Sequence, residues 1–277
     1  MLEFKETKVT GPVSNYQGSA HGLTSDHKPA GEAKQAKVIV TMPAYNAAKT
    51  LIKTFEEIDK GIVSEIILVD DCSQDETVAI GGTLDIKVIR HPHNVGYGGN
   101  QKTCYLEALR DGADVVIMLH PDYQYDPRKV PDMVAPILAG EADIVLGSRF
   151  LGGGALKGGM PMYKFIANRF LTTTQNLVLG TCLSEFHTGY RAYSRRFLEK
   201  VPFLRNSIQF VFDAEILCQA VYFDFKISEI PVETRYFPEA SSINFWSSVK
   251  YGLGVLGSLG KYWLAKNGIA GSPLFRP

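Results

Sequence analysis

The stretch ADVVIMLHPDYQYDP, residues 113–127, joins an apolar run directly to a polar tip, and it decides the fold class. The run VVIML is typical of a strand that is buried on both faces of a parallel sheet. The tip ends in Asp126-Pro127, the pattern of a helix N-cap with proline at the first helical position. Because ligands of α/β proteins bind where strands end, this stretch predicts a strand, a binding tip and a helix.

The same order of elements repeats along the chain. Apolar runs at 36–41, 65–71, 86–91 and 142–150 each adjoin segments with helical spacing or turn residues, and Pro43 is expected to end the first strand. The pattern predicts an α/β fold with a Rossmann-like, mostly parallel sheet flanked by helices. Right-handed crossovers then bring the polar tips to one sheet edge. These tips read PAYN, VDDCSQD, RHPHNVGYGG and LHPDYQYD.

Composition excludes several classes of protein. Lys+Arg and Asp+Glu both number 29, so the net charge of zero argues against a nucleic-acid partner. The start of the chain is polar, and no apolar run approaches the roughly 20 residues that span a bilayer. The four cysteines form no C-x-x-C pair, which predicts reduced thiols rather than a zinc site or disulfides. We therefore expect a cytoplasmic protein.

Six motifs, taken in order, resemble family 2 glycosyltransferases with a GT-A fold. They read MPAYNAAKTL, ILVDDCSQDET, NVGYGGNQ, DYQYDP, GSRF and HTGYRAYSRR. Within that family they are similar to the polyprenyl-phosphate (dolichol-phosphate) sugar transferase branch. The resemblance implies an inverting enzyme of cell-envelope glycan biosynthesis. It would move a hexose from a UDP- or GDP-sugar to an acceptor, most often polyprenyl phosphate, with Mn²⁺ or Mg²⁺ as cofactor.

The motifs also divide the chain. Residues 1–35 lack periodicity and are expected to form a flexible arm. Residues 36–238 would form the glycosyltransferase domain, with a nucleotide-binding half at 36–127 and an acceptor half at 128–238. Residues 239–277 have the pattern of an amphipathic helical tail with aromatic and lysine residues. Such a tail fits peripheral docking on the inner face of a membrane or packing on a sister subunit in a homo-oligomer, and both stay open.

The resemblance implies a set of residues around the sugar nucleotide. Asp70 would accept a hydrogen bond from the base, while backbone N–H groups near Gly96 and the Lys102 amine would approach the diphosphate. The full set is Pro43, Ala44, Tyr45, Asn46, Asp70, Gly96, Lys102, His120, Pro121 and Asp122. The family usually has glutamate after Asn46, where this chain has Ala47, so one base or ribose contact is missing.

The tip HPDYQ takes the place of the family's Asp-x-Asp-x-Gln metal motif. Aligned residue by residue, His120 stands at the first Asp, Asp122 at the second and Gln124 at the Gln, and these three are the candidate metal ligands. Imidazole suits Mn²⁺ better than Mg²⁺. Three interpretations stay open: a cation held through Asp122 with His120 nearby, a metal-free site with His120 as a cationic substitute, and a polar loop without a role in binding.

The acceptor side rests on the later motifs. Arg149, Lys164, His187, Thr188 and Arg191 would line it, with the guanidinium groups of Arg149 and Arg191 on an acceptor phosphate. Asp213 and Glu215 could supply a base, which a hydroxyl acceptor needs and an anionic phosphate does not. The candidate catalytic set is thus Asp122, Arg149, Arg191, Asp213 and Glu215.

The sequence gives less support to other functions. A glycan or protein hydroxyl is the alternative acceptor. A catalytically silent sugar-nucleotide-binding module would explain the missing first Asp and the missing glutamate. A nucleotidyltransferase usually has a basic glycine-rich loop after the first strand, and TMPAYNAAKTL lacks one. The glycines of NVGYGGN do not form the G-x-G-x-x-G pattern of dinucleotide oxidoreductases.

Overall fold

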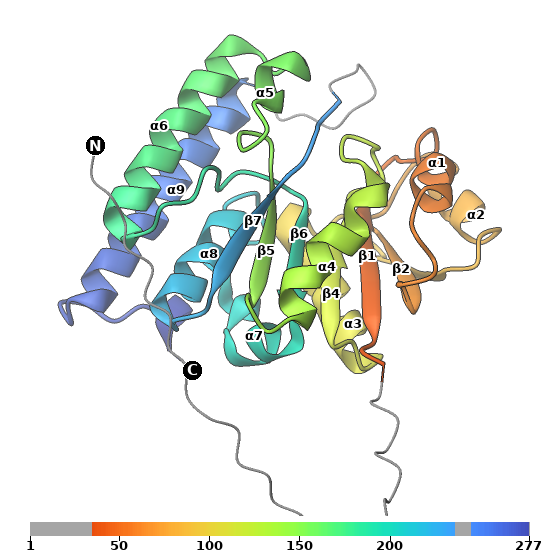
Figure 1. The fold of residues 1–277 in the computed structure, drawn as a ribbon, viewed down its shortest axis with the longest axis horizontal. Coiled ribbons are helices and arrows are strands. Elements are labelled where there is room, and N and C mark those ends of the chain that lie inside the picture. The colour runs from red at the N-terminus through yellow and green to blue at the C-terminus, as the bar shows by residue number, and fades with distance from the viewer. Residues whose placement is uncertain (1–34, 236–244, 277) are drawn as a thin grey trace, which may run out of the picture. The chain divides into compact units, whose positions relative to one another are not determined.

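A computed structural model describes residues 35–235 and 245–276, which fold around one sheet with helices on both faces (Figure 1). The strand order is β3-β2-β1-β4-β6-β5-β7. The strand bounds are β1 Val38–Ala44, β2 Glu65–Asp70, β3 Lys87–Arg90, β4 Val115–Met118, β5 Ile144–Ser148, β6 Arg191–Ser194 and β7 Ile227–Pro231. Only β6 runs against its neighbours within this sheet, so the predicted α/β fold with a mostly parallel sheet is confirmed.

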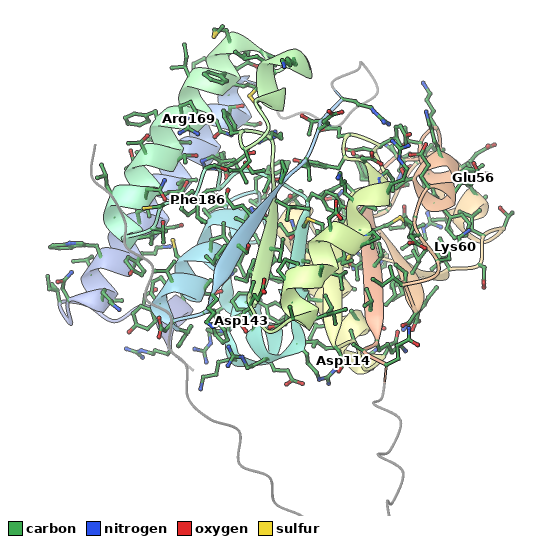
Figure 2. The ribbon with its side chains drawn as sticks, viewed as in Figure 1. Glu56, Lys60, Asp114, Asp143, Arg169 and Phe186 are labelled. Atoms are coloured by element: carbon green, nitrogen blue, oxygen red, sulfur yellow. The ribbon has the colours of Figure 1, made fainter. Side chains whose placement is uncertain are left out.

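Helices cover the two faces of the sheet and enclose two apolar cores. One core joins β-strand residues such as Met118 to helices α3 and α8, and the other joins residues such as Ile117 to α1 and α4. Figure 2 shows side chains filling the space between these layers. The helix bounds are α1 Leu51–Glu56, α2 Thr77–Gly81, α3 Tyr97–Arg110, α4 Val130–Leu138, α5 Gly154–Lys157, α6 Met162–Leu179, α7 Arg195–Lys200, α8 Phe212–Tyr222 and α9 Phe245–Lys266.

The first strand is longer than the sequence suggested. β1 continues through Pro43 to Ala44 and pairs with β2 along this extension. Its pairing with β4 ends at Thr41, so the missing N–H of Pro43 removes no bond on that side. The prediction that Pro43 ends the strand was therefore wrong.

Strand β6 was not recognised in the sequence because its residues, RAYS, include an arginine and a serine. It lies between β4 and β5 and is antiparallel to both, with Arg191 opposite Met118. The segment before β6 carries the motif HTGY. The strand thus brings that motif to the carboxyl ends of β4 and β5.

Two long helices flank the sheet at the β7 end. α6 and α9 lie side by side, green and blue in Figure 1, and α9 also packs on α8. Within the described residues no helix is both long enough and apolar enough to cross a membrane. The predicted arm falls almost wholly outside the described residues, and the division of 36–238 into two halves stays a prediction.

Candidate active site

A cavity of about 250 Å³ opens where β4 and β5 end. Its walls come from both sides of the sheet edge and from α6 and α9, so segments far apart in the sequence meet there. The lining residues include Tyr97, His120, Asp122, Gln124, Tyr125, Arg149, Tyr163, Lys164, Asn168, His187, Phe210, Asp213, Ser248 and Tyr251. Seven of the predicted site residues therefore share one cavity: His120, Asp122, Gln124, Arg149, Lys164, His187 and Asp213.

His120 stands directly after β4 and stacks on a tyrosine. The rings of His120 and Tyr97 are 5.6 Å apart between centroids and nearly parallel, and His120 Nε2 lies 3.4 Å from the Tyr97 hydroxyl. Burial lowers the pKa of His120 below its usual value, although the carboxylates of Asp122 and Asp213 act in the opposite direction. A neutral imidazole at neutral pH counts against His120 as a cationic substitute for a metal.

The loop that carries Asp122 is held in a fixed conformation. Its centre, Tyr123, has a left-handed backbone (φ 58°), and the Tyr123 ring lies between Lys53 and Arg235. The Asp122 carboxylate accepts a hydrogen bond from the Gln124 backbone N–H at 3.1 Å. The Pro121 carbonyl, in turn, accepts one from the Thr50 hydroxyl at 2.6 Å. These contacts place the Asp122 side chain at the cavity.

The predicted role of Asp126 is confirmed. Its carboxylate accepts a hydrogen bond from the Arg128 N–H and caps the 3₁₀ turn Pro127–Lys129, with Pro127 at the first position. This turn leads directly into α4. Asp126 therefore has a capping role at the end of the tip, and it does not line the cavity.

Asp213, the second residue of α8, has a dense set of donors. Its carboxylate accepts hydrogen bonds from the Tyr97 hydroxyl at 2.8 Å and from the Gln101 amide at 3.2 Å, and Arg191 Nη1 lies 3.5 Å away. Burial and the Asp213 charge raise the pKa of Tyr97 well above its usual value, so the hydroxyl stays protonated and donates. Asp213 is thus an oriented carboxylate within the cavity wall.

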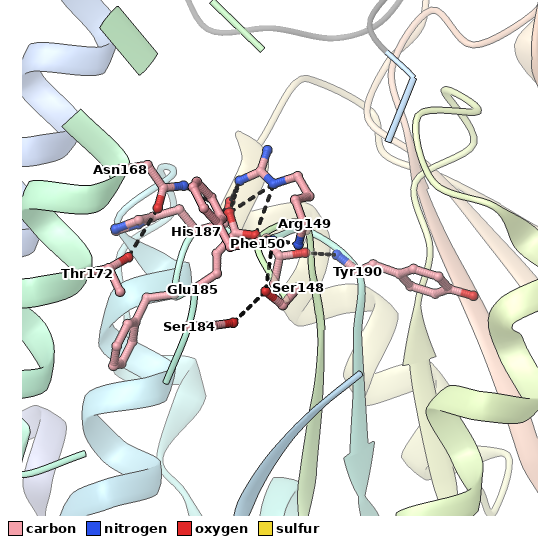
Figure 3. A network of polar contacts seen from close by, with 12 residues as sticks. Ser148, Arg149, Phe150, Asn168, Thr172, Ser184, Glu185, His187 and Tyr190 are labelled. Carbon is pink, nitrogen blue, oxygen red and sulfur yellow. Dashed lines mark hydrogen bonds and ion pairs between the residues drawn. The ribbon is translucent and has the colours of Figure 1, made fainter. Parts of the chain in front are cut away.

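Arg149 follows β5 and pairs with the fully buried Glu185 (Figure 3). Arg149 Nε donates to Glu185 at 2.9 Å, Arg149 Nη2 donates to the His187 carbonyl at 2.8 Å, and the Asn168 amide donates to Glu185 at 2.9 Å. Burial alone would raise the pKa of Glu185, but the Arg149 guanidinium outweighs it and holds the pKa below its usual value. The pair is therefore charged, and it ties α6 to the segment before β6.

Lys164, the third residue of α6, is a further cation close to Arg149. Burial, and then the charge of Arg149, lower its pKa. The Lys164 amine has no acceptor among residues 35–235 and 245–276, whereas Arg149 is already neutralised by Glu185. Within this described part of the chain, Lys164 therefore brings a cation without an acidic partner to the cavity.

His187 connects the cavity to the C-terminal helix. Its Nδ1 lies 2.7 Å from the Tyr251 hydroxyl on α9, and its Nε2 is buried without a partner among the described residues. Burial lowers the pKa of His187 to about 3, so the ring is neutral. One ring nitrogen thus remains available to a ligand in the cavity.

The tip after β2 holds an unsatisfied carboxylate oxygen. Asp70 is fully buried, and its Oδ2 accepts a hydrogen bond from the Ser73 N–H at 3.0 Å. Its Oδ1 is buried with no partner in the described part of the chain. Buried acceptors are rarely left unpaired, so this atom is suited to a ligand N–H.

The neighbouring Asp71 links two tips of the sheet edge. Its carboxylate accepts hydrogen bonds from the backbone N–H groups of Val95 and Gly96 at 2.8 and 3.1 Å, and His91 Nδ1 lies 3.0 Å away. Asp71 therefore anchors the glycine-rich tip after β3 against the tip after β2.

The glycines of that tip do not form the expected anion cradle. Gly96 N–H bonds to Asp71, and the Gly98 N–H donates to the Ile208 carbonyl at 2.9 Å. A Cβ on Gly96 would meet the Ile208 carbonyl oxygen at 2.6 Å, so glycine is needed for chain packing. The Lys102 amine likewise donates to the Asn206 carbonyl and does not line the cavity.

The first tip offers less side-chain surface than predicted. Pro43 and Ala44 are buried within β1. Tyr45 is 56% exposed at the strand end, and the Asn46 side chain accepts a hydrogen bond from the Gln74 N–H at 2.8 Å. Of these four residues, Tyr45 alone presents a large exposed side chain.

Two predicted acceptor residues lie beneath the cavity rather than in it. Arg191 has no exposed surface, and its guanidinium donates to the carbonyls of Thr188, Asp213 and Phe186 at 2.8, 3.0 and 3.1 Å. The Thr188 hydroxyl is also fully buried, 3.3 Å from the Tyr125 hydroxyl. Because backbone carbonyls take up the Arg191 donors and the side chain has no exposed surface, the structure gives no support to its predicted contact with an acceptor phosphate.

Glu215 is also turned away from the cavity. Its carboxylate accepts a hydrogen bond from the Ser207 N–H at 2.6 Å, and it is 4% exposed. Asp213 is therefore the carboxylate of this helix that faces the site. Tyr97, Tyr125, Asn168 and Tyr251 line the cavity without having been predicted; Tyr97 lies inside the quoted motif NVGYGGNQ, while nothing local marks Tyr251.

The side chains near Asp122 include few candidate ligands for a divalent cation. The described residues hold no group of three or more His, Cys, Asp or Glu side chains that could bind a metal. Asp122 and the neutral His120 nevertheless face the same cavity. One carboxylate and one imidazole fit a cation that takes its other ligands from phosphate and water, as Mg²⁺ and Mn²⁺ do.

The family model described as glycosyl transferase family 2 matches residues 39–202, more than half of the chain. The chain belongs to glycosyl transferase family 2. The match includes five segments that line the cavity, from Tyr97 at the start of α3 to the segment before β6. This family 2 glycosyltransferase extends beyond the match through α8, β7 and α9.

Curated relatives place the enzyme within the family. An uncharacterised protein of Methanocaldococcus jannaschii is 30% identical over 74% of this chain and 84% of its own length. The UDP-N-acetylglucosamine–dolichyl-phosphate N-acetylglucosaminyltransferase of Methanococcus voltae is 26% identical over 72% of this chain and 86% of its own length. The polyprenol monophosphomannose synthase of Mycolicibacterium smegmatis is 25% identical over 74% and 79%. The predicted resemblance to polyprenyl-phosphate sugar transferases is thereby confirmed.

Solved structures support the GT-A fold of this family 2 glycosyltransferase. Glucosyl-3-phosphoglycerate synthase from Mycobacterium tuberculosis with bound UDP gives a TM-score of 0.65 at 21% identity, covering 86% of this chain and 82% of that one. The same enzyme with Mn²⁺, UDP-glucose and glycerol 3-phosphate gives 0.64 at 20% identity, over the same shares. At this identity the likeness concerns the fold.

Proposed function

We propose that this family 2 glycosyltransferase transfers a hexose, with inversion, from a UDP- or GDP-sugar to polyprenyl phosphate. The observation that carries the proposal is the cavity that Asp122 and His120 share with Lys164, whose amine has no acidic partner among the described residues. This arrangement can hold a donor diphosphate and an acceptor anion on either side of one reacting carbon.

The donor side rests on Asp70 and Asp122. The unpartnered Asp70 Oδ1 suits a ring N–H of uracil or guanine, and the exposed Tyr45 ring lies at the adjacent strand end. Asp122 lies two strands along, at the end of β4. The relative from Methanococcus voltae is named for a UDP-sugar donor, which is consistent with this assignment.

A divalent cation would be held by Asp122, with His120 and Gln124 as the neighbouring candidate ligands. When bound it neutralises the charge that develops on the departing nucleoside diphosphate. The chain's own contribution is to orient the Asp122 carboxylate through Gln124 and to keep His120 neutral against Tyr97.

The acceptor side rests on Lys164. A phosphate monoester is already anionic near neutral pH, so binding it beside Lys164 and Arg149 orients an oxygen for in-line attack without a strong base. The Arg149–Glu185 pair holds Arg149 in place and fixes the Asn168 side chain. Arg191 is proposed to act through others, since it supports the 186–188 backbone and the Asp213 carboxylate.

A hydroxyl acceptor on a glycan or protein is the second candidate, and Asp213 favours it. This carboxylate faces the cavity and is oriented by Tyr97 and Gln101, as a general base would be. The two candidates differ in what they require of Asp213. With a phosphate acceptor the group is dispensable for proton removal, and with a hydroxyl acceptor it is essential.

The test is a matrix of radiolabelled UDP- and GDP-sugars against polyprenyl phosphate and against free glycans. We expect one donor to label the lipid fraction, and we expect little label in glycans. Label in glycans alone would reject the lipid-phosphate acceptor. Label in neither, combined with calorimetric binding of a sugar nucleotide in the presence of Mn²⁺, would indicate a catalytically silent sugar-nucleotide-binding module.

A further inference from the structure

The outer surfaces of α6 and α9 expose an unusual amount of apolar side chain. On α9 these residues recur every three or four positions and so form one stripe along the helix. They are Val249, Leu253, Leu256 and Trp263, exposed by 41, 66, 39 and 52%. On α6 they are Met162, Ile166, Phe170 and Leu177, exposed by 59, 61, 62 and 79%. Together these eight residues are called the α6–α9 face below.

Soluble proteins seldom leave apolar surface of this extent without a partner. The opposite sides of the two helices are accounted for, because Leu171 and Leu179 of α6 and Val255 and Leu259 of α9 pack in the core. The exposed stripes are therefore additional to the apolar residues that the fold needs.

Charge is segregated on the same two helices. Residues 144–184 and 245–277 contain no Asp or Glu, although the chain as a whole has 29 acids and 29 bases. These two segments carry Arg149, Lys157, Lys164, Arg169, Lys250, Lys261, Lys266 and Arg276. Lys157, Lys250, Lys261 and Lys266 are exposed. The region thus combines apolar stripes with exposed lysines and has no acidic residue within its own two segments.

We propose that the α6–α9 face docks on the surface of an anionic lipid bilayer. Neither helix can span a bilayer, so each would lie in the plane of the interface with its apolar stripe among the acyl chains. Anionic headgroups complement the exposed lysines. A second copy of the chain fits less well, since its equivalent face would bring lysines against lysines.

The cavity lies beside the proposed docking face, because residues of the same two helices line it. Tyr163, Lys164 and Asn168 of α6 and Tyr251 of α9 line it, so the same two helices form its wall and the docking face. A lipid-borne acceptor would enter between them without leaving the bilayer surface. The docking itself concerns a surface and not the reaction, so it stands or falls separately from the proposed function.

The test is flotation of the full chain with vesicles that contain neither acceptor nor sugar nucleotide. We expect binding to mixed phosphatidylcholine–phosphatidylglycerol vesicles at low ionic strength, and at least about tenfold weaker binding to pure phosphatidylcholine or at high salt. No binding to the anionic vesicles at low salt would overturn the proposal, whatever the behaviour of any variant.

Variants separate the apolar and the charge contributions. Leu253→Ser with Phe170→Ser should weaken binding about tenfold or more, whereas Leu138→Ser, an exposed leucine at the end of α4, should bind like the native chain. Lys261→Ala should weaken binding several-fold and Lys200→Ala on α7 should not. Equal loss in the controls would contradict the assignment of the face.

Analytical ultracentrifugation tests the alternative that a second copy of the chain covers the α6–α9 face. A monomeric native chain that binds vesicles supports the bilayer. A dimer that dissociates in the Leu253→Ser, Phe170→Ser variant, without vesicle binding by the native chain, would assign the face to a second copy and overturn the proposal. Unchanged thermal unfolding midpoints would exclude misfolding as the cause, since both side chains are solvent-exposed.

Discussion

The hydroxyl of Tyr97, the first residue of α3, donates a 2.8 Å hydrogen bond to the carboxylate of Asp213, on α8. The bond crosses 116 positions of sequence, and both residues line the cavity. Since the same tyrosine ring stacks on His120, it links the acceptor-side carboxylate to the donor-side tip.

Asp213→Asn tests which acceptor class the site serves. With polyprenyl phosphate as acceptor, kcat should fall by less than about tenfold, because the attacking oxygen is already anionic. With a hydroxyl acceptor the fall should be about 100-fold or more. Initial rates with each acceptor measure this. Tyr97→Phe, which removes a donor and keeps the carboxylate, is the matched control and should have the smaller effect.

Lys164→Ala tests the acceptor anion site. Loss of an uncompensated cation should raise the acceptor KM about tenfold while leaving the donor KM nearly unchanged, because the amine is expected to contact the acceptor alone. Steady-state kinetics in both substrates would measure it. Lys200→Ala, an exposed lysine on α7, should behave like the native enzyme; a donor KM that rises in parallel would move Lys164 to the donor side.

Asp70→Asn tests the base contact. An amide can place an NH₂ group where the native Oδ1 accepts, so nucleotide affinity should fall about tenfold or more. Isothermal calorimetry with UDP and GDP checks it, with Asp132→Asn, an exposed α4 residue, as control. Unchanged affinity for both nucleotides would remove Asp70 from the site.

His187 predicts a pH dependence of stability. Its folded pKa of about 3 lies below its unfolded value, so the unfolded chain binds the proton first as pH falls. The stability that neutral His187 provides is complete above about pH 6.5, and it declines by up to about 1.4 kcal/mol per pH unit as the pH falls toward 3.

Urea unfolding of the native chain and His187→Gln from pH 7.5 to 4.5 measures this decline as a difference between the two proteins. The exposed His93→Gln variant is the control and should track the native chain. A difference between native and His187→Gln that stays constant with pH would show that the histidine does not titrate as inferred.

Local sequence was sufficient for most of the fold. The runs IILV (66–69) and VVIM (115–118) are apolar throughout because both faces of their strands are covered, and this pattern is legible without the structure. β6 was missed because Arg191 can be buried there only through the carbonyls of Phe186, Thr188 and Asp213. No local pattern signals such distant acceptors.

The site shows the same limit. Asp122, His120 and Arg149 follow apolar strands, so their position at the sheet edge could be predicted from the chain. The hydrogen bonding of the glycine-rich tip could not be predicted, because the carbonyl that accepts from its N–H groups belongs to the distant Ile208. Tyr251 reaches His187 across 64 positions, and only the packing of α9 brings the two together.

Asp122→Asn tests the central claim most directly. The initial rate of sugar transfer into polyprenyl phosphate should fall about 100-fold or more at saturating Mn²⁺, because the substitution removes the carboxylate that we propose to act at the donor diphosphate. Asp126→Asn, which keeps a capping side chain in the same loop, should retain most of the native rate. Full activity in Asp122→Asn, with the cation present, would contradict the assignment of this cavity as the site of transfer.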